Sequence, residues 1–296
     1  MDHKFFLRSI ICLTIAITSF SSLLGCKTST NSLFNPKRAY ENIEIQLAFG
    51  PRFPGSIGHQ QEIKWIKNIL DSNSWVVEEQ VFSYKGTQIT NILAKKGEEN
   101  PLIVLGAHYD TRKISDKESD LNKRLLPVPG ANDGASGVAV LLELARILPD
   151  ENRIQLVFFD AEDQGNISNW EWSIGSEHYV KNLYFIPEKA VILDMVADKD
   201  LQFYQEAYSD RKLSSAIWII GQRLGYSNVF FDEIKYAMID DHRPFINSGI
   251  PALLIIDFDY PYWHTQKDQI DAVSIESLNI IGTVIFVWIK TSLLSD

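Results

Sequence analysis

The feature that most constrains the fold of this chain is a repeated arrangement, in which short apolar runs lead into a carboxylate or an imidazole. The side chains at these five places are His108 in LIVLGAHYD, Asp133 in PGANDGASG, Glu162 and Asp163 in LVFFDAEDQG, Asp194 in AVILDM, and His264 in YWHTQKD. Open α/β folds bind ligands beyond the carboxyl ends of their strands, so the five places predict one shared cleft. Carboxylates and imidazoles suit zinc, and the pattern therefore predicts a zinc enzyme.

Strand-like and helical segments alternate along the chain, which favours an α/β fold with a largely parallel inner sheet. Apolar runs and alternation predict strands over 75–84, 87–96, 101–110, 153–160, 190–196, 201–205 and 251–258. Helical spacing predicts helices over 37–49, 59–71, 134–148, 175–183, 214–225 and 276–294. The last of these is strongly apolar, but Asn279, Thr283 and Lys290 interrupt it, which favours a core helix over a membrane span. The polar segment 111–130 predicts a long functional or mobile loop.

Residues 1–26 predict an export signal that is separate from the fold. Lys4 and Arg8 precede an apolar stretch, and the segment ends in Leu-Leu-Gly-Cys at Cys26. This ending resembles a bacterial lipobox, in which Cys26 would be lipidated; a plain signal peptide or an uncleaved anchor is the alternative. We expect residues 27–36 to form a tether and residues 37–296 to form the catalytic domain. The protein would then be an exported, membrane-anchored lipoprotein on the periplasmic side or the cell surface.

Composition excludes some partners and some sources of stability. The net charge is −10 and no basic stripe occurs, which argues against a nucleic-acid partner. The two cysteines, Cys12 and Cys26, both lie in the export segment, so the domain after it has no internal disulfide and depends on its core. The length suits one large α/β domain or two small ones, and we expect a monomeric catalytic domain.

Each candidate residue also has an ordinary structural explanation. Asp133 precedes a predicted helix, where an aspartate commonly serves as the N-cap. Glu162 and Asp163 could be an exposed acidic turn, although one could instead bind metal while the other handles protons. The sequence His-Tyr-Asp after the third strand suggests a link from the His108 imidazole to Asp110.

Six motifs in order raise the functional interpretation above these alternatives. GAHYD, GANDGASG, FFDAED, ILDMV, DDHRPF and WHT resemble those of the zinc-exopeptidase superfamily, which includes aminopeptidases and glutaminyl cyclases. The resemblance implies a single-domain, three-layer α/β/α sandwich with a central mixed, mostly parallel twisted sheet. Each motif alone is weak, but their shared order is specific.

Two members of that superfamily assign the residues differently. Dinuclear aminopeptidases resemble this chain at His108, Asp133, Asp194 and His264, and at Glu162 with Asp163, where they have a pair of glutamates. This resemblance implies two zinc ions. Glutaminyl cyclases resemble it more closely and would bind one zinc through Asp133, Asp163 and His264. Bacterial cyclases also resemble it in the Trp263 that precedes the last histidine and in the Asp-Asp-His that begins at Asp240.

The closer resemblance implies a glutaminyl-peptide cyclotransferase, which converts N-terminal glutamine of peptides or proteins to pyroglutamate and releases ammonia. It implies that Glu162 transfers the proton while Asp194 and Asp240 form a supporting acidic network. Trp263 would form a pocket wall, as would either Trp170 or Trp172. His108 would be a remnant of the two-metal site or an outer-shell residue.

Overall fold

The computed structural model describes residues 33–150 and 152–293; the predicted export signal and Cys26 lie outside them. The strands are β1 (Val76–Tyr84), β2 (Thr87–Lys95), β3 (Ile103–His108), β4 (Ile154–Phe159), β5 (Lys189–Asp194), β6 (Phe203–Glu206), β7 (Phe230–Tyr236) and β8 (Ala252–Ile256). The α-helices are α1 (Pro36–Ala48), α2 (Ile57–Ser72), α3 (Ala135–Ile147), α4 (Ile174–Lys181), α5 (Arg211–Arg223), α6 (Arg243–Asn247) and α7 (Ile275–Leu293). Two short 3₁₀ helices, Lys123–Leu125 and Ile270–Ala272, lie in connecting segments.

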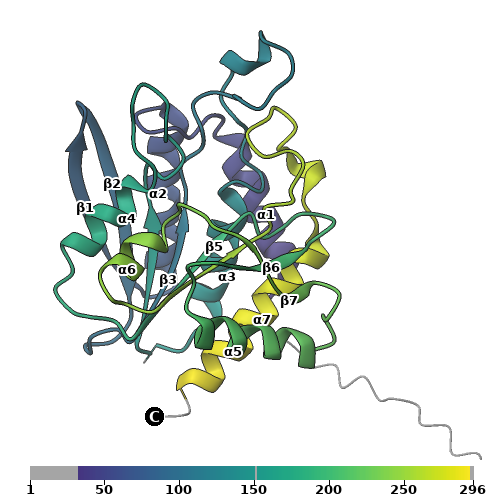
Figure 1. The fold of residues 1–296 in the computed structure, drawn as a ribbon. Helices are drawn as coiled ribbons and strands as arrows, with labels where there is room; N and C mark the ends of the chain where they lie inside the picture. Colours follow the sequence, from purple (N-terminus) through teal and green to yellow (C-terminus); the bar gives the residue numbers. More distant parts are fainter. Residues whose placement is uncertain (1–32, 151, 294–296) are drawn as a thin grey trace, which may run out of the picture. The chain divides into compact units, whose positions relative to one another are not determined.

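A six-stranded mixed sheet forms the centre of the domain, in the order β1-β2-β4-β3-β5-β8 (Figure 1). The β1–β2 and β2–β4 pairs are antiparallel, whereas β4, β3, β5 and β8 run parallel to one another. A separate pair, β6 and β7, is also parallel. The predicted α/β class and mostly parallel inner sheet are therefore confirmed. Four parallel strands bring their carboxyl ends to one edge of the sheet.

Helices cover both faces of this sheet, and each face has its own apolar core. Leu105 points to the face packed by α1, α3 and α7, while its neighbour Val104 joins the core beneath α4 and α6. This alternation is the two-residue period of a strand that is buried on both faces. The predicted three-layer arrangement is thus present.

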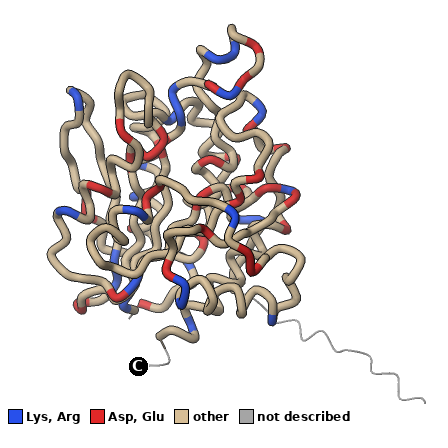
Figure 2. The backbone as a smooth tube through the Cα atoms, in the orientation of Figure 1, with Lys and Arg blue, Asp and Glu red and all other residues tan. Residues whose placement is uncertain are grey.

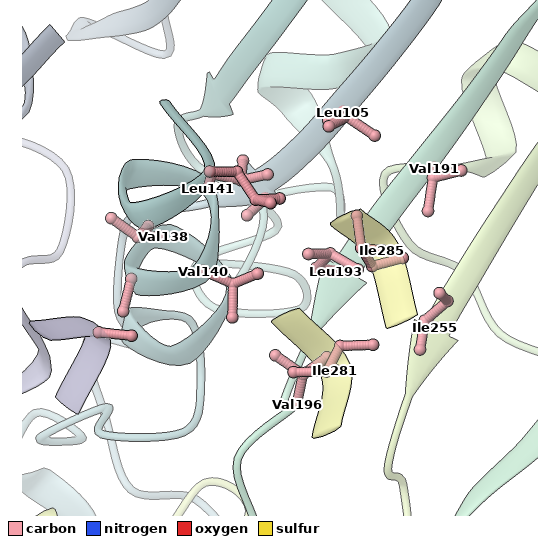
Figure 3. Close-up of a cluster of buried hydrophobic side chains, with 14 of the residues drawn as sticks. Leu105, Val138, Val140, Leu141, Val191, Leu193, Val196, Ile255, Ile281 and Ile285 are labelled. Atoms are coloured by element: carbon pink, nitrogen blue, oxygen red, sulfur yellow. The ribbon is translucent and has the colours of Figure 1, made fainter. Parts of the chain in front are cut away.

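The strongly apolar α7 is built into the larger core. Ile281 and Ile285 lie beside Leu193 and Val196 in the cluster shown in Figure 3. Among the described residues, α7 is the one helix long and apolar enough to cross a membrane, but 56% of its most apolar window is buried inside the protein. The structure supports the predicted core helix, because burial against the sheet explains its composition.

Several local features differ from the sequence prediction. The sequence analysis missed β7, an exposed strand paired only with β6, and α6, which has five residues. Their weak apolar patterns explain the omission, since a short or exposed element needs little periodicity. Phe34, within the predicted tether, is 3% exposed, so the packed domain includes it. Over the described part of the chain, acidic and basic residues are interspersed along the backbone and form no basic stripe in the view of Figure 2.

Candidate metal centre

The sheet topology brings the predicted residues together. His108 and Asp194 are the last residues of the parallel strands β3 and β5. Glu162 and Asp163 follow β4, and His264 lies in the loop after β8. Asp133 ends the 111–133 loop directly before Gly134, the N-cap of α3. All six side chains are buried, with exposed fractions of 2% for His108, 3% for Asp133, 6% for Glu162, 1% for Asp163, 7% for Asp194 and 1% for His264.

Two groups of metal-competent side chains share Asp133. The first, here called the Asp163 cluster, contains Asp133, Asp163 and His264; the second, the His108 cluster, contains His108, Asp133 and Asp194. His264 Nε2 lies 2.9 Å from Asp163 Oδ1 and 3.7 Å from Asp133 Oδ2. His108 Nε2 lies 3.0 Å from Asp194 Oδ1 and 3.2 Å from Asp133 Oδ1. The two oxygens of Asp133 therefore face different clusters.

The Asp163 cluster offers free ligand atoms in a buried place. Asp133 Oδ2 and Asp163 Oδ2 are buried and have no hydrogen-bond partner among residues 33–150 and 152–293. A buried carboxylate oxygen without a partner is costly unless a cation or proton compensates it. Two carboxylates and one imidazole are also the ligand types of a catalytic zinc site with an open position. The residues of this cluster thus fit a zinc ion.

In the His108 cluster the imidazole already has partners at both ring nitrogens. Its Nε2 faces the carboxylates of Asp133 and Asp194, and its Nδ1 lies 3.1 Å from the backbone oxygen of Asp110. These contacts satisfy the ring without an ion. The ligand types still suit a metal, so this cluster remains a candidate second site.

Asp133 is held by the loop that carries His264. The backbone N–H groups of Asn132 and Asp133 donate to the Asp268 carboxylate at 2.8 and 3.2 Å. The predicted N-cap role of Asp133 is wrong, because α3 has Gly134 as its N-cap and no side-chain cap bond. A Cβ at Gly134 would lie 2.5 Å from His108 Cε1, so only glycine permits this approach.

Asp110 holds the backbone that presents Glu162 and Asp163. Its carboxylate accepts hydrogen bonds from the N–H of Glu162 at 2.9 Å and from Gln164 Nε2 at 2.9 Å. The predicted link from His108 to Asp110 exists, but through the Asp110 carbonyl; the carboxylate is 3.7 Å from Nδ1. Asp110 therefore orders two loops of the site at once.

Glu162 has the properties of a proton-transfer group. It is not one of the three Asp163-cluster side chains, and the Ser173 hydroxyl donates to its Oε1 at 3.1 Å. Burial and the nearby charge of Asp240 raise the pKa of Glu162 well above its usual value. Burial and the charge of Asp194 likewise raise the pKa of Asp240. This acidic group favours a shared proton, because burial and like charges disfavour full ionisation.

The Asp163 cluster holds a proton when no ion is bound. Burial lowers the pKa of His264, but the charges of Asp163, Asp116 and Asp133 outweigh burial and raise that pKa to about 9. Burial raises the pKa of Asp163 to about 6, against the opposing charge of His264. Metal ligands must lose their protons, so an ion here competes with the proton on His264.

The sequence analysis missed an arginine–aspartate pair whose aspartate lies beside His264. Arg112 donates to both oxygens of Asp116 at 2.8 and 3.1 Å, and Asp116 Oδ1 lies 3.2 Å from His264 Nδ1. Arg112 Nη1 also donates to the backbone oxygen of Asp163 at 3.0 Å. Metal-binding imidazoles commonly have a carboxylate at the second nitrogen. The acidic residues of the predicted 111–130 loop were therefore the signal from which a partner for His264 could have been predicted.

Tryptophans enclose the Asp163 cluster in a cavity of about 370 Å³. The ring of Trp263 stacks on His264 with centroids 3.8 Å apart, and Trp172 faces the same imidazole at 6.2 Å. Trp172 lines this cavity, whereas Trp170 packs on Tyr84. Asp133, Glu162, Asp163, Asp194 and Asp240 also line it.

The Asp-Asp-His motif is divided among three environments. Asp240 lines the cavity, while Asp241 accepts a hydrogen bond from the Ser176 hydroxyl and His242 pairs with Glu206 at 3.0 Å. Only the first of the three thus faces the candidate reaction space. The other two fasten the segment to α4 and to the end of β6.

Backbone strain is concentrated at this edge of the sheet. Ala161, Met195 and His264 have φ values of 57°, 45° and 56°, in the left-handed region that non-glycine residues rarely adopt. Each is a site residue or the chain neighbour of one. Such strain persists where the surrounding contacts enforce it, which is common at functional sites.

A buried centre of this kind at the carboxyl edge of a three-layer α/β sandwich defines a metal-dependent enzyme of the zinc-exopeptidase type. Residues 89–289 match peptidase family M28, and the chain belongs to that family. The glutaminyl cyclase of Porphyromonas gingivalis has a similar structure, with a TM-score of 0.83 and 32% identity over 88% of this chain and 99% of that one.

Two relatives with assigned activities point to different reactions within the family. The aminopeptidase YwaD of Bacillus subtilis is 30% identical over 67% of this chain, and the match spans only 42% of that protein. The glutaminyl-peptide cyclotransferase of Gloydius blomhoffii is 26% identical over 86% of this chain and 82% of that protein. The match to the cyclotransferase covers more of both chains.

Proposed function

We propose that this chain is a glutaminyl-peptide cyclotransferase that converts N-terminal glutamine of peptides or proteins to pyroglutamate and releases ammonia. One observation carries the proposal. Glu162, with a raised pKa, opens into the same cavity as the unpartnered oxygens of Asp133 and Asp163. A proton-transfer group beside a zinc-competent cluster is what this reaction needs.

In the reaction the substrate's α-amine nitrogen forms a bond to its own γ-carbonyl carbon, and the bond from that carbon to the amide nitrogen breaks. Both groups belong to one residue, so the enzyme's main task is to orient them. Glu162 accepts the proton that the amine loses and returns it to the departing amide nitrogen, which leaves as ammonia. Asp194 and Asp240 support Glu162, and Trp172 and Trp263 enclose the glutamine side chain.

We propose that one zinc ion is held by Asp133, Asp163 and His264. When bound, zinc supplies Lewis-acid polarisation of the γ-amide carbonyl. The hydrogen-bond partners within the two clusters support the Asp163 cluster as the zinc site. His108 has contacts at both nitrogens, whereas the Asp163 cluster has two unsatisfied oxygens.

The second candidate is an aminopeptidase with two zinc ions, which hydrolyses peptides at the N-terminal residue. The specific observation in its favour is the His108 cluster, because Asp133 directs one oxygen to each group as a bridging ligand would. Metal stoichiometry and product identity separate the two candidates.

Mass spectrometry of two peptides tests the proposal directly. The zinc-loaded protein is incubated with one peptide that begins with glutamine and another that begins with leucine. Loss of ammonia from the first, with the second unchanged, is the expected result. Release of free leucine would overturn the proposal in favour of the aminopeptidase, and two zinc ions per chain would accompany it.

We further propose that the protein is exported, lipidated at Cys26 and anchored to a membrane, with a monomeric catalytic domain. The support is the sequence alone: Lys4 and Arg8, an apolar stretch, and Leu-Leu-Gly before the cysteine. Metabolic labelling with a fatty acid should mark the wild-type protein and not Cys26→Ser. Equal labelling of both would contradict the anchor.

A further inference from the structure

A second cavity adjoins the metal centre and is lined by a different set of residues. It measures about 580 Å³ and shares Trp172, Ile239 and Asp240 with the cavity that contains the Asp163 cluster. We call the second one the outer cavity. Its remaining walls come from the end of β1, from α4 and from α6. The three shared residues make the outer cavity the direct neighbour of the candidate metal centre.

One wall of the outer cavity is aromatic. Phe82 and His178 stack with ring centroids 3.7 Å apart and an interplanar angle of 5°, and Tyr84 lies on the same strand as Phe82. Such flat surfaces pack against peptide side chains and main chain with little loss of conformational entropy. They accept many residues and do not by themselves define a preference.

Another part of the lining carries an arginine whose side-chain donors have no partner among the described residues. Arg243 lines the outer cavity, and its guanidinium lies 3.5 Å from the centroid of the Tyr208 ring. Among residues 33–150 and 152–293, no carboxylate pairs with this guanidinium and none of its side-chain N–H groups has a hydrogen-bond partner; Nη1 is also buried. Arg112, by contrast, is fully engaged by Asp116, Asp163 and Gly165.

The stacking geometry fits Arg243 for recognition of a carboxylate. A ring over the flat face of a guanidinium holds the group in place and leaves its in-plane N–H donors available. Two such donors match the two oxygens of a carboxylate. The other cation of the outer cavity, Lys181, already pairs with Glu177 at 2.7 Å.

We propose that the outer cavity binds the residues after the N-terminal glutamine, and that Arg243 favours an acidic side chain at the second or third position. This rests on the proposed cyclotransferase function. Glu171 lines the same cavity, but it is exposed, so water screens its repulsion of an incoming carboxylate.

The test compares matched peptides that differ by one group. Zinc-loaded full-length protein receives peptides that begin with glutamine and carry either glutamate or glutamine at position two or three. We expect kcat/KM to be about tenfold higher for glutamate at one of these positions, which corresponds to about 1.4 kcal/mol. Arg243→Gln should remove the preference while kcat/KM on the neutral peptide stays within about threefold.

Two further variants separate charge from geometry. Arg243→Lys keeps the charge and loses the planar fork, so it should retain only part of the preference. Lys181→Gln removes the paired cation and should leave the preference near the wild-type value. No acidic preference in the wild type, or an undiminished one in Arg243→Gln, would overturn the proposal.

A binding measurement keeps this proposal distinct from the cyclotransferase function. Calorimetry with pyroglutamyl peptides that carry glutamate or glutamine reports recognition without turnover. If no peptide is cyclised, the proposed function fails, and the proposal for Arg243 is then decided by binding alone. Equal affinities of wild type for the two peptides would reject it even if cyclisation is efficient.

Discussion

The two clusters that share Asp133 use similar side chains in different ways. In the His108 cluster every nitrogen of the imidazole has a protein partner, whereas the Asp163 cluster leaves two buried carboxylate oxygens without one. Ligand type alone therefore does not distinguish the two clusters, whereas the lone pairs that the protein leaves unsatisfied do.

The largest effect is expected at a residue outside both clusters. Glu162→Gln keeps the shape of the side chain but removes its basicity, so kcat should fall by about a thousandfold while zinc content is unchanged. Steady-state kinetics and metal analysis on the same sample measure both. Near-normal turnover would remove Glu162 from its proposed role, and loss of zinc would assign it to the metal site.

Alanine substitutions at the two histidines compare the clusters directly. His264→Ala removes a ligand and should weaken zinc binding by more than about a hundredfold, since loss of an outer-shell partner already costs about ten- to a hundredfold. His108→Ala should retain one zinc ion with affinity within about tenfold of wild type. Competition with a chelator measures both affinities. The reverse ranking would assign the ion to the His108 cluster.

A smaller effect is expected for the carboxylate behind His264. Asp116→Asn should lower zinc affinity by about tenfold, because it weakens the partner of His264 Nδ1 and the clamp from Arg112. Asp120→Asn, in the same loop but exposed, is the matched control. Equal affinities for the two variants would show that Asp116 does not position the imidazole.

The smallest effect, a proton count, distinguishes one occupied cluster from two. The raised pKa of His264, about 9, means that its ring is protonated below that pH in the metal-free protein. Zinc binding near pH 7.5 should therefore release about one proton, and affinity should rise with pH until about 9. His108 also has a raised pKa, despite the opposing effect of burial, because Asp194 is close. Occupation of both clusters would release about two protons, which calorimetry in buffers of different ionisation enthalpy detects.

Much of the site's location followed from local sequence pattern. The apolar runs before His108 and Asp194 identified the parallel strands β3 and β5, whose carboxyl ends must meet at one edge of the sheet. The same reasoning identified the core helix α7 from a few polar interruptions. Boundaries agreed to within a few residues because strong periodicity reflects burial directly.

Prediction from sequence was weakest where side chains choose partners between distant segments. The local pattern at Asp133 allowed both a helix cap and a metal ligand, and the structure directs its two oxygens to His108 and His264. The choice between Trp170 and Trp172 was open until the loop conformation directed Trp172 to the cavity. Neither outcome has a local signal, because each depends on loops folding against one another.

The sequence by itself determined the α/β class, the edge of the sheet where the candidate residues meet and the residue types gathered there, since strand periodicity and strand ends are local properties of the chain. Only the tertiary structure decided which carboxylate oxygens are unsatisfied, that Asp116 lies against His264, and that no described residue pairs with the Arg243 guanidinium beside the candidate metal centre. The physical reason is that hydrogen-bond satisfaction is a property of contacts between segments, and these exist only after the chain has folded.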